Sequence, residues 1–305
     1  MRFSYATDEH PLLQRTLIRA IERIGGQGKL RKLYREHQRS RRPEESFFTA
    51  AVRLLELDVR YDKALLDLTP RHGPVLFVAN HPYGVLDGIA LTWLAMQVRP
   101  DVKVLAIDVL CQDAEARHNL LPIDFAATQA ARATVLASRL EAQSWLKEGH
   151  AIGIFPGGGV STSEKPLRGP AIDLAWAPFT AKLIGMSRAT VIPVYFVGQN
   201  SRLFQLASHL SMTLRLSLVF RETARRIGTA LEVRVGRPIP YAELSGFADR
   251  RELVGELRRR TFALALSPDG RLPVPDRLLR PFGLEVYKKP LAATLAHSRR
   301  RPACG

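Results

Sequence analysis

The chain has 305 residues, of which 46% are hydrophobic and 24% charged, and this composition supports a sizeable core and excludes a disordered chain. Lysines and arginines number 45 against 29 aspartates and glutamates, a formal net charge of +16. This charge favours a polyanionic partner, which is nucleic acid, an anionic bilayer or an acidic protein, although a solvated basic surface gives the same count. The two cysteines, Cys111 and Cys304, cannot form a disulfide framework, which favours a reducing compartment.

Neither a secretory signal nor a membrane-spanning segment is predicted. The first ten residues contain no apolar core of the kind that a signal peptide needs. The longest mostly apolar stretch, residues 203–220, carries His209, Arg215 and several hydroxyl groups, so we do not expect it to cross a bilayer. If the protein meets a membrane, we expect it to lie on the surface.

The N-terminal region is predicted to be helical and basic. Apolar residues recur at helical spacing over residues 11–24, and Gly25 and Gly26 are expected to end that helix. A run of cations interleaved with apolar residues follows, made of Lys29, Arg31, Lys32, Arg35, Arg39, Arg41 and Arg42. Such a segment either lies in a bilayer interface or packs as a helical hairpin with a solvated polar face. Ser46 is expected to cap a helix that reaches about Glu56.

From residue 74, apolar strands alternate with helices, which predicts an α/β fold with a mostly parallel sheet flanked by helices. The predicted strands are 75–78, 102–107, 151–155, 190–197 and 231–235. The predicted helices are 86–96, 132–147, 171–184 and 250–266. We therefore expect a basic helical membrane-association segment over 1–57, an α/β domain over 58–266, and an extended, partly mobile Pro/Arg-rich tail over 267–305.

The first motif places His81 where a buried strand meets a helix, with Asp87 six residues later. In open α/β sheets, ligands bind beyond the carboxyl ends of the strands. A carboxylate that accepts from one imidazole nitrogen fixes the tautomer and leaves the other nitrogen to take a proton. Gly84 allows the loop to fold tightly enough for the two side chains to meet. The motif predicts a general base, against the alternative of a capping histidine and an exposed helix aspartate.

The second motif is a strand that runs into a glycine-rich turn, residues 157–159, followed by Ser161 and Thr162. Exposed backbone N–H groups in such a turn can bind an anion or an oxyanion, and Lys165 and Arg168 can add positive charge for a phosphate or a carboxylate. The turn is neither a Walker loop nor a dinucleotide fingerprint, and a plain flexible turn is the alternative. The third motif, residues 191–200, predicts a buried strand whose Pro193 places it at an edge or a bulge.

In this order, the three motifs resemble the glycerolipid acyltransferase superfamily, which includes the lysophosphatidic acid acyltransferases. The resemblance covers roughly residues 70–240. The first block of the family, Asn-His followed by Asp, is matched by Asn80, His81 and Asp87. The Phe-Pro-Glu-Gly block is matched by Phe155, Pro156 and Gly159, and the apolar Val-Ile-Pro-Val strand by residues 191–194. Residues 121–125, with Asp124, lie in the place of the second block.

The variant Asn-His-Pro-Tyr-Gly-Val-Leu-Asp-Gly, with Asp173 and Trp176 downstream, is most similar to the hemolysin-like branch, which includes acyltransferases of ornithine-lipid synthesis. The chain departs from the family pattern at three points, of which the last two concern recognition of a glycerol phosphate. One extra residue separates His81 from Asp87, glycine at 157 or 158 replaces the acidic residue of Phe-Pro-Glu-Gly, and Phe125 stands where the family has a phosphate-binding arginine. The resemblance therefore implies the type of reaction more strongly than the substrate.

The resemblance implies a glycerol-3-phosphate acyltransferase-like fold and transfer of a fatty acyl group from an acyl thioester, carried by coenzyme A or acyl carrier protein. The acceptor would be lysophosphatidic acid, another lyso-phospholipid or lyso-ornithine lipid. His81 would deprotonate the attacking hydroxyl or amine, Asp87 would hold the imidazole, and amides of the 157–159 turn or of Gly84 would steady the oxyanion. The residues expected to contact substrate are Asn80, Tyr83, Gly84, Asp124, Phe155, Pro156, Gly157, Gly158, Gly159, Ser161, Lys165, Arg168 and Pro193.

We expect no metal and no cofactor, because the sequence contains no cluster of metal ligands. The expected location is the cytoplasmic face of a membrane, where an anionic surface attracts the basic segment. Two other functions are open. A thioesterase or lipase would use Cys111 or Ser161 as nucleophile, but a Gly-x-Ser-x-Gly elbow is missing. A degenerate protein would only bind lipid or a polyanion, although nucleic acid is not expected because no recognised binding motif is present.

Overall fold

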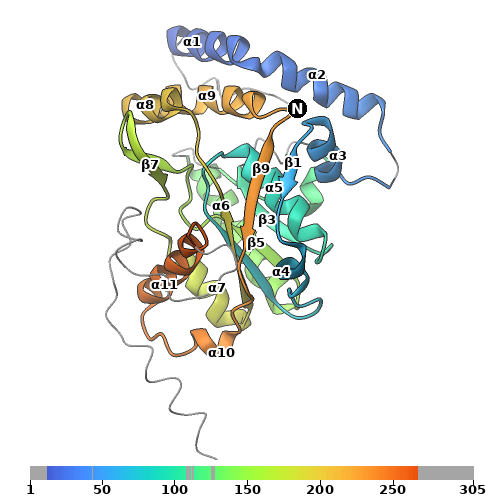
Figure 1. The fold of residues 1–305 in the computed structure, drawn as a ribbon, viewed down its shortest axis with the longest axis vertical. Coiled ribbons are helices and arrows are strands. Elements are labelled where there is room, and N and C mark those ends of the chain that lie inside the picture. Colours follow the sequence, from blue (N-terminus) through green and yellow to red (C-terminus); the bar gives the residue numbers. More distant parts are fainter. Residues whose placement is uncertain (1–11, 43, 108–110, 112, 125–127, 267–305) are drawn as a thin grey trace, which may run out of the picture.

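The computed structural model describes residues 12–42, 44–107, 111, 113–124 and 128–266. The predicted tail over 267–305 lies outside the described residues. The described part forms a seven-stranded sheet in the order β1-β9-β8-β2-β5-β3-β4 (Figure 1). Its strands are β1 (Asp58–Arg60), β2 (Val75–Ala79), β3 (Lys103–Ile107), β4 (Leu120–Ile123), β5 (Ala151–Ile154), β8 (Thr190–Phe196) and β9 (Ala230–Val235). Neighbouring strands run parallel except for the antiparallel pair β8–β9, which confirms the predicted α/β fold.

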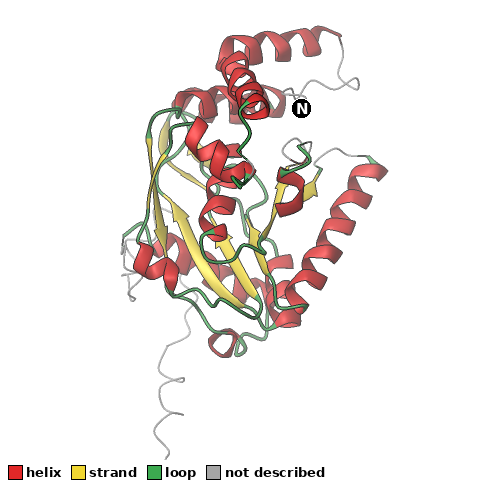
Figure 2. Cartoon of the chain, turned by 90° about the vertical axis from the view of Figure 1, so that its right-hand side faces the viewer, coloured by secondary structure: helices red, strands yellow, loops and turns green. Residues whose placement is uncertain are grey.

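Helices cover both faces of this sheet (Figure 2). One face packs against α3 (Phe47–Leu54), α4 (Lys63–Asp67) and α5 (Val85–Met96). The other packs against α6 (Gln129–Lys147), α7 (Phe179–Ser187), α10 (Tyr241–Leu244) and α11 (Arg250–Ala263). Strand β2 shows why both faces must be covered: Val75 and Phe77 join the first cluster, Leu76 and Val78 join the second, and all four are fully buried. Alternation of side chains along a strand sends successive apolar groups to opposite faces.

The predicted helix over 171–184 is wrong in its first half. Residues 162–172 instead form an antiparallel hairpin of β6 (Thr162–Lys165) and β7 (Arg168–Ile172), and α7 starts only at Phe179. Pro178 is the N-cap of α7, and a proline disfavours the helical conformation in the residue before it. The helix therefore does not extend back through Ala177, and residues 173–177 form a connection without regular secondary structure.

Strand β8 is an interior strand, so the predicted edge position of Pro193 is wrong. It lies between β2 and β9, with Pro193 opposite Val78. On the β9 side, Val191 pairs with Ile239 and Val194 with Val235, so the partner segment has one residue more than β8 over this interval. Pro193 accepts from Gly236 N–H at 2.8 Å. Proline has no N–H to donate, and the pairing with the β9 side is irregular at this point. This irregularity is the bulge that the sequence offered as the other possibility.

Two helices at the N-terminus lie end to end on top of the sheet domain and meet at a kink (Figure 1). They are α1 (Leu12–Glu22) and α2 (Gly28–Arg39), joined by a kinked π-type turn, η1 (Arg23–Gln27), and we call them the N-terminal helix pair. The N-terminal helix pair packs on α9 (Met212–Arg225), which follows α8 (Arg202–Leu210). A Cβ added at Gly25 would lie 3.0 Å from Arg221 Cβ, and one at Gly26 would lie 2.7 Å from Ala224 Cβ. The two glycines therefore allow the helix pair to approach α9 closely, besides ending α1 as predicted.

Polar contacts also hold α2 against the sheet domain. The Tyr34 hydroxyl donates to Asp113 Oδ2 at 2.7 Å, and Arg41 forms an ion pair with Glu115 at 3.0 Å. The next helix, α3, is capped as predicted, because Ser46 Oγ accepts from Thr49 N–H at 3.2 Å. In the part of the chain that the structure describes, no helix is both long enough and apolar enough to span a bilayer.

The amino ends of the parallel strands are tied together by one buried arginine. Arg99, which is 2% exposed, donates to the carbonyl oxygens of Pro70, Gly73 and Gly149 at 2.7–3.3 Å. Its guanidinium also forms a two-point contact with Asp101 at 2.7 and 2.9 Å. Gly73 precedes β2 and Gly149 precedes β5, so this side chain closes the edge of the sheet opposite the carboxyl ends.

Candidate active site

The first motif forms the loop between β2 and α5, at the carboxyl ends of the central strands. Asn80 fixes the start of this loop, because its side-chain amide pairs with the backbone of Phe196 on the neighbouring β8. Asn80 Nδ2 donates to Phe196 O at 2.9 Å, and Asn80 Oδ1 accepts from Phe196 N–H at 2.6 Å. Asn80 is 3% exposed, so its side chain holds the loop to the sheet.

The structure brings His81 and Asp87 together despite the six-residue separation. His81 Nδ1 lies 3.0 Å from Asp87 Oδ2. The ring nitrogen lies off the direction that a good hydrogen bond requires, so the contact is close but bent, as catalytic hydrogen bonds often are before substrate binds. The loop can close because Gly84 has φ of +80°, a conformation that residues with a Cβ avoid.

Asp87 is fully buried in the first turn of α5. Its Oδ2 accepts from the backbone N–H groups of Tyr83 at 2.7 Å and Gly84 at 2.9 Å, and its Oδ1 has no hydrogen-bond partner among the described residues. Burial raises the pKa of the Asp87 carboxyl above its usual value, and the contact with His81 and the two amides oppose that rise. All of the polar partners of the Asp87 side chain therefore lie in the loop that carries His81.

The imidazole of His81 lies between the protein interior and solvent. Its ring stacks on Phe155 with a centroid separation of 4.2 Å and an interplanar angle of 27°. The His81 side chain is 17% exposed while Asp87 is 0% exposed. With Nδ1 directed to the buried carboxylate, Nε2 is the ring nitrogen left to contact a substrate.

A second buried carboxylate, Asp173, holds the same loop from the other side. Its Oδ1 accepts from His81 N–H at 3.1 Å and from the Ser161 hydroxyl at 2.5 Å, and its Oδ2 accepts from Trp176 Nε1–H at 3.0 Å. Ser161 N–H in turn donates to His81 O at 2.8 Å. Burial raises the pKa of Asp173, opposed by hydrogen bonds from Ser161, Trp176 and the His81 amide. The backbone of His81 is therefore fixed at both its N–H and its carbonyl group.

The glycine-rich turn packs directly against Asp173. A Cβ added at Gly157 would lie 3.0 Å from Asp173 Cβ and 3.4 Å from Asp173 Oδ2. Pro156 O accepts from Ala177 N–H at 2.9 Å, which ties the turn to the segment that carries Asp173. The acidic side chain that the family has in its Phe-Pro-Glu-Gly block would have no room at Gly157, because the carboxylate from residue 173 fills that space.

The amides proposed for an oxyanion site differ in availability. Gly84 N–H donates to Asp87, so the alternative that placed it at the oxyanion is wrong. Gly158 N–H closes the turn on Phe155 O at 3.0 Å. Within the described residues, the N–H groups of Gly157 and Gly159 have no acceptor, so these two are the turn amides left for a developing negative charge.

Tyr83 and helix α9 pack against the loop between β2 and α5. The Tyr83 hydroxyl donates to Val197 O at 2.6 Å, and burial raises the pKa of this hydroxyl to about 12. Arg226 lies over the Tyr83 ring at 4.2 Å. A Cβ at Gly84 would lie 3.1 Å from Val160 Cγ2 and 3.8 Å from Val219 Cγ1 of α9. Helix α9 therefore contacts the catalytic loop on one side and the N-terminal helix pair on the other.

The remaining predicted residues are distributed around this centre. Asp124 directly follows the edge strand β4, at the same carboxyl edge but three strands away from β2. Lys165 and Arg168 are exposed and pair with each other across the β6–β7 hairpin, and no contact joins either of them to His81 or Asp87 among the described residues. Pro193 is buried in β8 beside β2, and Phe125 lies outside the described residues.

Asp173 was not assigned a role from the sequence, because nothing in the local pattern shows that a residue 92 positions away will bind the His81 amide. The resemblance to the family had pointed to Asp173 and Trp176 only as residues that lie downstream of the first block. Among the residues that the structure describes, no cluster of three or more His, Cys, Asp or Glu side chains is arranged to hold a metal ion.

Comparison with known proteins gives the same family. A family model described as an acyltransferase matches residues 15–270. The lyso-glycine lipid O-acyltransferases of Phocaeicola vulgatus and Bacteroides thetaiotaomicron are each 26% identical to the chain over 193 residues, which is 61% of this chain. The matched stretch is 66% of the first relative and 68% of the second, so the chain spans about two thirds of their length.

A solved structure is also similar, the 1-acyl-sn-glycerophosphate (LPA) acyltransferase PlsC of Thermotoga maritima. It has a TM-score of 0.45 and 15% sequence identity, over 85% of this chain and 82% of that chain. The family model, which spans most of the chain, confirms the resemblance carried by the three motifs. The chain belongs to the acyltransferase family, and the protein is an acyltransferase.

Proposed function

We propose that the protein transfers a fatty acyl group from an acyl thioester to a hydroxyl or amine of a lysolipid, with His81 as the general base. The observation that carries this proposal is the contact between His81 Nδ1 and the buried Asp87 carboxylate at 3.0 Å, at the carboxyl ends of the central strands. The thioester is carried by coenzyme A or by acyl carrier protein.

In the proposed reaction, His81 Nε2 takes the proton from the acceptor as its oxygen or nitrogen attacks the thioester carbonyl carbon. The new bond forms at that carbon, and the carbon–sulfur bond then breaks. The proton held by His81 passes to the leaving thiolate, which departs as the free thiol. Asp87 keeps Nδ1 protonated and balances the charge of the imidazolium, as a carboxylate does in other histidine-based sites.

The negative charge that develops on the carbonyl oxygen needs donors. The N–H groups of Gly157 and Gly159 are free for this task within the described residues. Removal of one such donor typically lowers kcat by roughly 100- to 1,000-fold. The turn is held in place through Asp173, so the donors and the base share one support.

Two features support a lysolipid as the acceptor. The two curated relatives are named as lyso-glycine lipid O-acyltransferases, and the sequence resembles a branch that includes enzymes of ornithine-lipid synthesis. An acceptor with an amino-acid headgroup would not need the glycerol-phosphate contacts that this chain lacks. Lysophosphatidic acid and other lyso-phospholipids are the second class of acceptor to test.

The positions of the possible nucleophiles weigh against a thioesterase or a lipase. The Ser161 hydroxyl donates to Asp173 at 2.5 Å, and Ser161 is 1% exposed. Cys111 is buried, with its Sγ directed to Ile107 O at 3.9 Å. A nucleophile must contact both the base and the substrate carbonyl, and neither side chain is held against the His81 ring.

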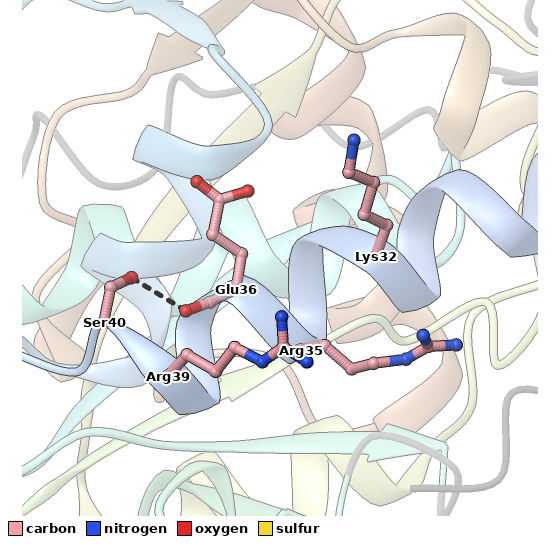
Figure 3. Close-up of a pocket in the computed structure, with 5 residues that line it drawn as sticks. All are labelled: Lys32, Arg35, Glu36, Arg39 and Ser40. Carbon is pink, nitrogen blue, oxygen red and sulfur yellow. Dashed lines mark hydrogen bonds between the residues drawn. The ribbon is translucent and has the colours of Figure 1, made fainter.

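We also propose that the N-terminal helix pair lies on an anionic membrane. The cations of α2 and the segment after it are exposed, while Leu30 is buried and Tyr34 is turned toward the sheet domain. Figure 3 shows Arg35 and Arg39 extending along one side of α2, while Lys32 projects from the helix in another direction. Exposed apolar side chains lie nearby in α1 and at the α8–α9 corner, where Leu12, Leu210 and Met212 are 76%, 69% and 64% exposed.

The membrane proposal predicts a loss of binding on charge reversal. Each basic residue near an anionic surface contributes roughly 1 kcal/mol, so reversing Arg31, Lys32 and Arg35 to Glu should move the protein from anionic vesicles to the supernatant. Sedimentation with vesicles that contain anionic lipid measures this, and neutral vesicles are the control. Unchanged partitioning of the triple variant would rule the N-terminal helix pair out as the attachment site.

The reaction is tested with purified protein, radiolabelled acyl-CoA or acyl carrier protein, and lysolipids of both classes. Labelled product with the wild type and none with His81→Ala is the expected result, and the lipid that gains label identifies the acceptor. Equal product from both proteins would remove His81 as the base. Absence of product with either donor would favour a protein that only binds lipid.

A further inference from the structure

Helix α9 places an arginine against the glycine-rich turn of the active site. The guanidinium of Arg215 donates to Val160 O and lies over the ring of Phe204 at 5.7 Å. A Cβ added at Gly159 would lie 3.9 Å from Arg215 Nη2. Phe204 is fully buried, so the guanidinium is held on a fixed platform rather than extended into solvent.

The positive charge of Arg215 has no carboxylate to neutralise it in the part of the chain that the structure describes. None of the acidic side chains there comes within 4.0 Å of its guanidinium. Burial lowers the pKa of Arg215, which reflects the cost of holding an unneutralised charge away from water. By contrast, Arg221 and Arg225 of the same helix both lie near Glu222.

Arg215 is connected to the catalytic loop through one residue. Its acceptor Val160 precedes Ser161, whose N–H donates to His81 O at 2.8 Å. Val160 also lies 3.1 Å from where a Cβ of Gly84 would stand, and Val219, one turn after Arg215 on α9, lies 3.8 Å from the same point. The side of α9 that carries Arg215 and Val219 therefore faces the loop of His81 and Asp87.

We propose that Arg215 binds the anionic group of the acceptor, a carboxylate or phosphate that lies a few bonds from the hydroxyl to be acylated. A guanidinium has five N–H donors, and the carbonyl of Val160 and the ring of Phe204 leave some of them for two-point binding of an oxyanion. The bound anion would supply the negative partner that the site lacks. This inference rests on the proposed lysolipid acyl transfer and assigns the acceptor subsite within it.

The acceptor is favoured over the donor because of where the charges lie in each molecule. The phosphates of an acyl-CoA are separated from the thioester by the whole pantetheine arm. The anion of a lysolipid headgroup is only a few bonds from its nucleophile, and Arg215 is within one residue of the loop that carries the base. Lys165 and Arg168, the cations that the sequence suggested for this task, are exposed on the hairpin beyond the turn.

The test compares charged and neutral acceptors. A 3-hydroxyacyl amide of glycine is paired with the matching glycinamide, and lysophosphatidic acid with monoacylglycerol, at fixed acyl-CoA. The variants are Arg215→Gln, which removes the positive charge, and Arg225→Gln as a control that removes an exposed charge from the same helix. Thermal unfolding of each variant checks that the fold is retained.

Arg215→Gln is expected to raise the KM for the charged acceptor by roughly 10- to 100-fold, the usual range for a lost hydrogen bond to a charged group. The KM for the neutral acceptor and for acyl-CoA should stay unchanged, and Arg225→Gln should behave as wild type. The acceptor pair in which the KM of the charged member rises shows whether the bound anion is a carboxylate or a phosphate. Independently of turnover, an N-acylglycine without the hydroxyl should stabilise the wild type against heat more than Arg215→Gln.

An equal effect on charged and neutral acceptors would overturn the inference, because it would reduce Arg215 to a brace for Val160. A higher KM for acyl-CoA alone would overturn it too, because the anion would then be a donor phosphate. Failure of the wild type to acylate any of the four acceptors would instead count against the proposed function, and the N-acylglycine stabilisation then decides the role of Arg215.

Discussion

Replacement of Asp87 by Asn separates the catalytic role of this residue from its structural role. The amide oxygen of Asn can take the place of Asp87 Oδ2 and accept from Tyr83 and Gly84, whose N–H groups now bind it at 2.7 and 2.9 Å. The amide nitrogen then takes the place of Oδ1, which has no partner among the described residues. The loop should keep its shape, while the negative charge against His81 is lost.

The expected loss of activity follows from that change. The amide oxygen in the place of Oδ2 can still accept from Nδ1–H, but no negative charge remains to balance the imidazolium. General acid–base catalysis contributes roughly 100- to 10,000-fold, so kcat of Asp87→Asn should fall within that range, or by about 3–5 kcal/mol of barrier. Asp87→Ala should also destabilise the fold, because two buried N–H groups would lose their acceptor at roughly 1–3 kcal/mol each.

The assay is steady-state acyl transfer together with thermal unfolding of both variants. Asp87→Asn should unfold near the wild-type temperature and lose kcat, whereas Asp87→Ala should lose both. A kcat for Asp87→Asn within a factor of three of wild type would refute the role of Asp87 as the partner of a general base. Equal destabilisation by Asn and Ala would refute the argument that Asn preserves the loop.

Three further results are expected. Gly157→Ala should lower the free energy of unfolding by about 1–3 kcal/mol, the range for overpacking, because its Cβ would meet Asp173 at 3.0 Å; unchanged urea unfolding would contradict this. Asp173→Asn should lower kcat more than Trp176→Phe, because it sets an N–H donor against the indole N–H and weakens the support of the catalytic loop; equal kcat values would count against that role. Burial alone raises the pKa of Asp113, but hydrogen bonds from Tyr34 and two backbone amides outweigh it and hold that pKa below its usual value. This stabilisation is present above the unfolded pKa, near pH 4, and is lost as the pH falls through the folded pKa, so Tyr34→Phe should unfold with a weaker dependence on acid pH in urea titrations.

The parts of the fold that the sequence predicted well are those in which one local signal decides the structure. Strand β2 is an uninterrupted apolar run, and the structure buries every residue of it. The cap at Ser46 and the stop at Gly25 and Gly26 also follow from local chemistry. The β6–β7 hairpin was missed because its burial pattern is mostly exposed, so it carries no strong apolar alternation.

The active site was predictable where its residues share one short segment. His81 and Asp87 are six positions apart, and the geometry of a strand–loop–helix connection makes their meeting plausible from spacing. Asp173 lies 92 positions from His81 along the chain. Arg215 comes from a different helix, α9. Their contacts depend on how α9 and the 173–177 connection pack, which no local periodicity encodes. The choice between an edge and a bulge at Pro193 was left open for the same reason, because a proline is judged locally while strand order is a tertiary property.

The buried arginine at the opposite edge of the sheet has a consequence for how such an enzyme can diversify. Arg99 ties the loops before β2 and β5 to the end of α5, at the far end of the strands from His81. Substitutions among the acceptor-facing residues can therefore accumulate while the frame keeps its shape. A directed-evolution library for new lipid headgroups should vary α9 and the glycine-rich turn, and should leave Arg99 and its carbonyl partners untouched.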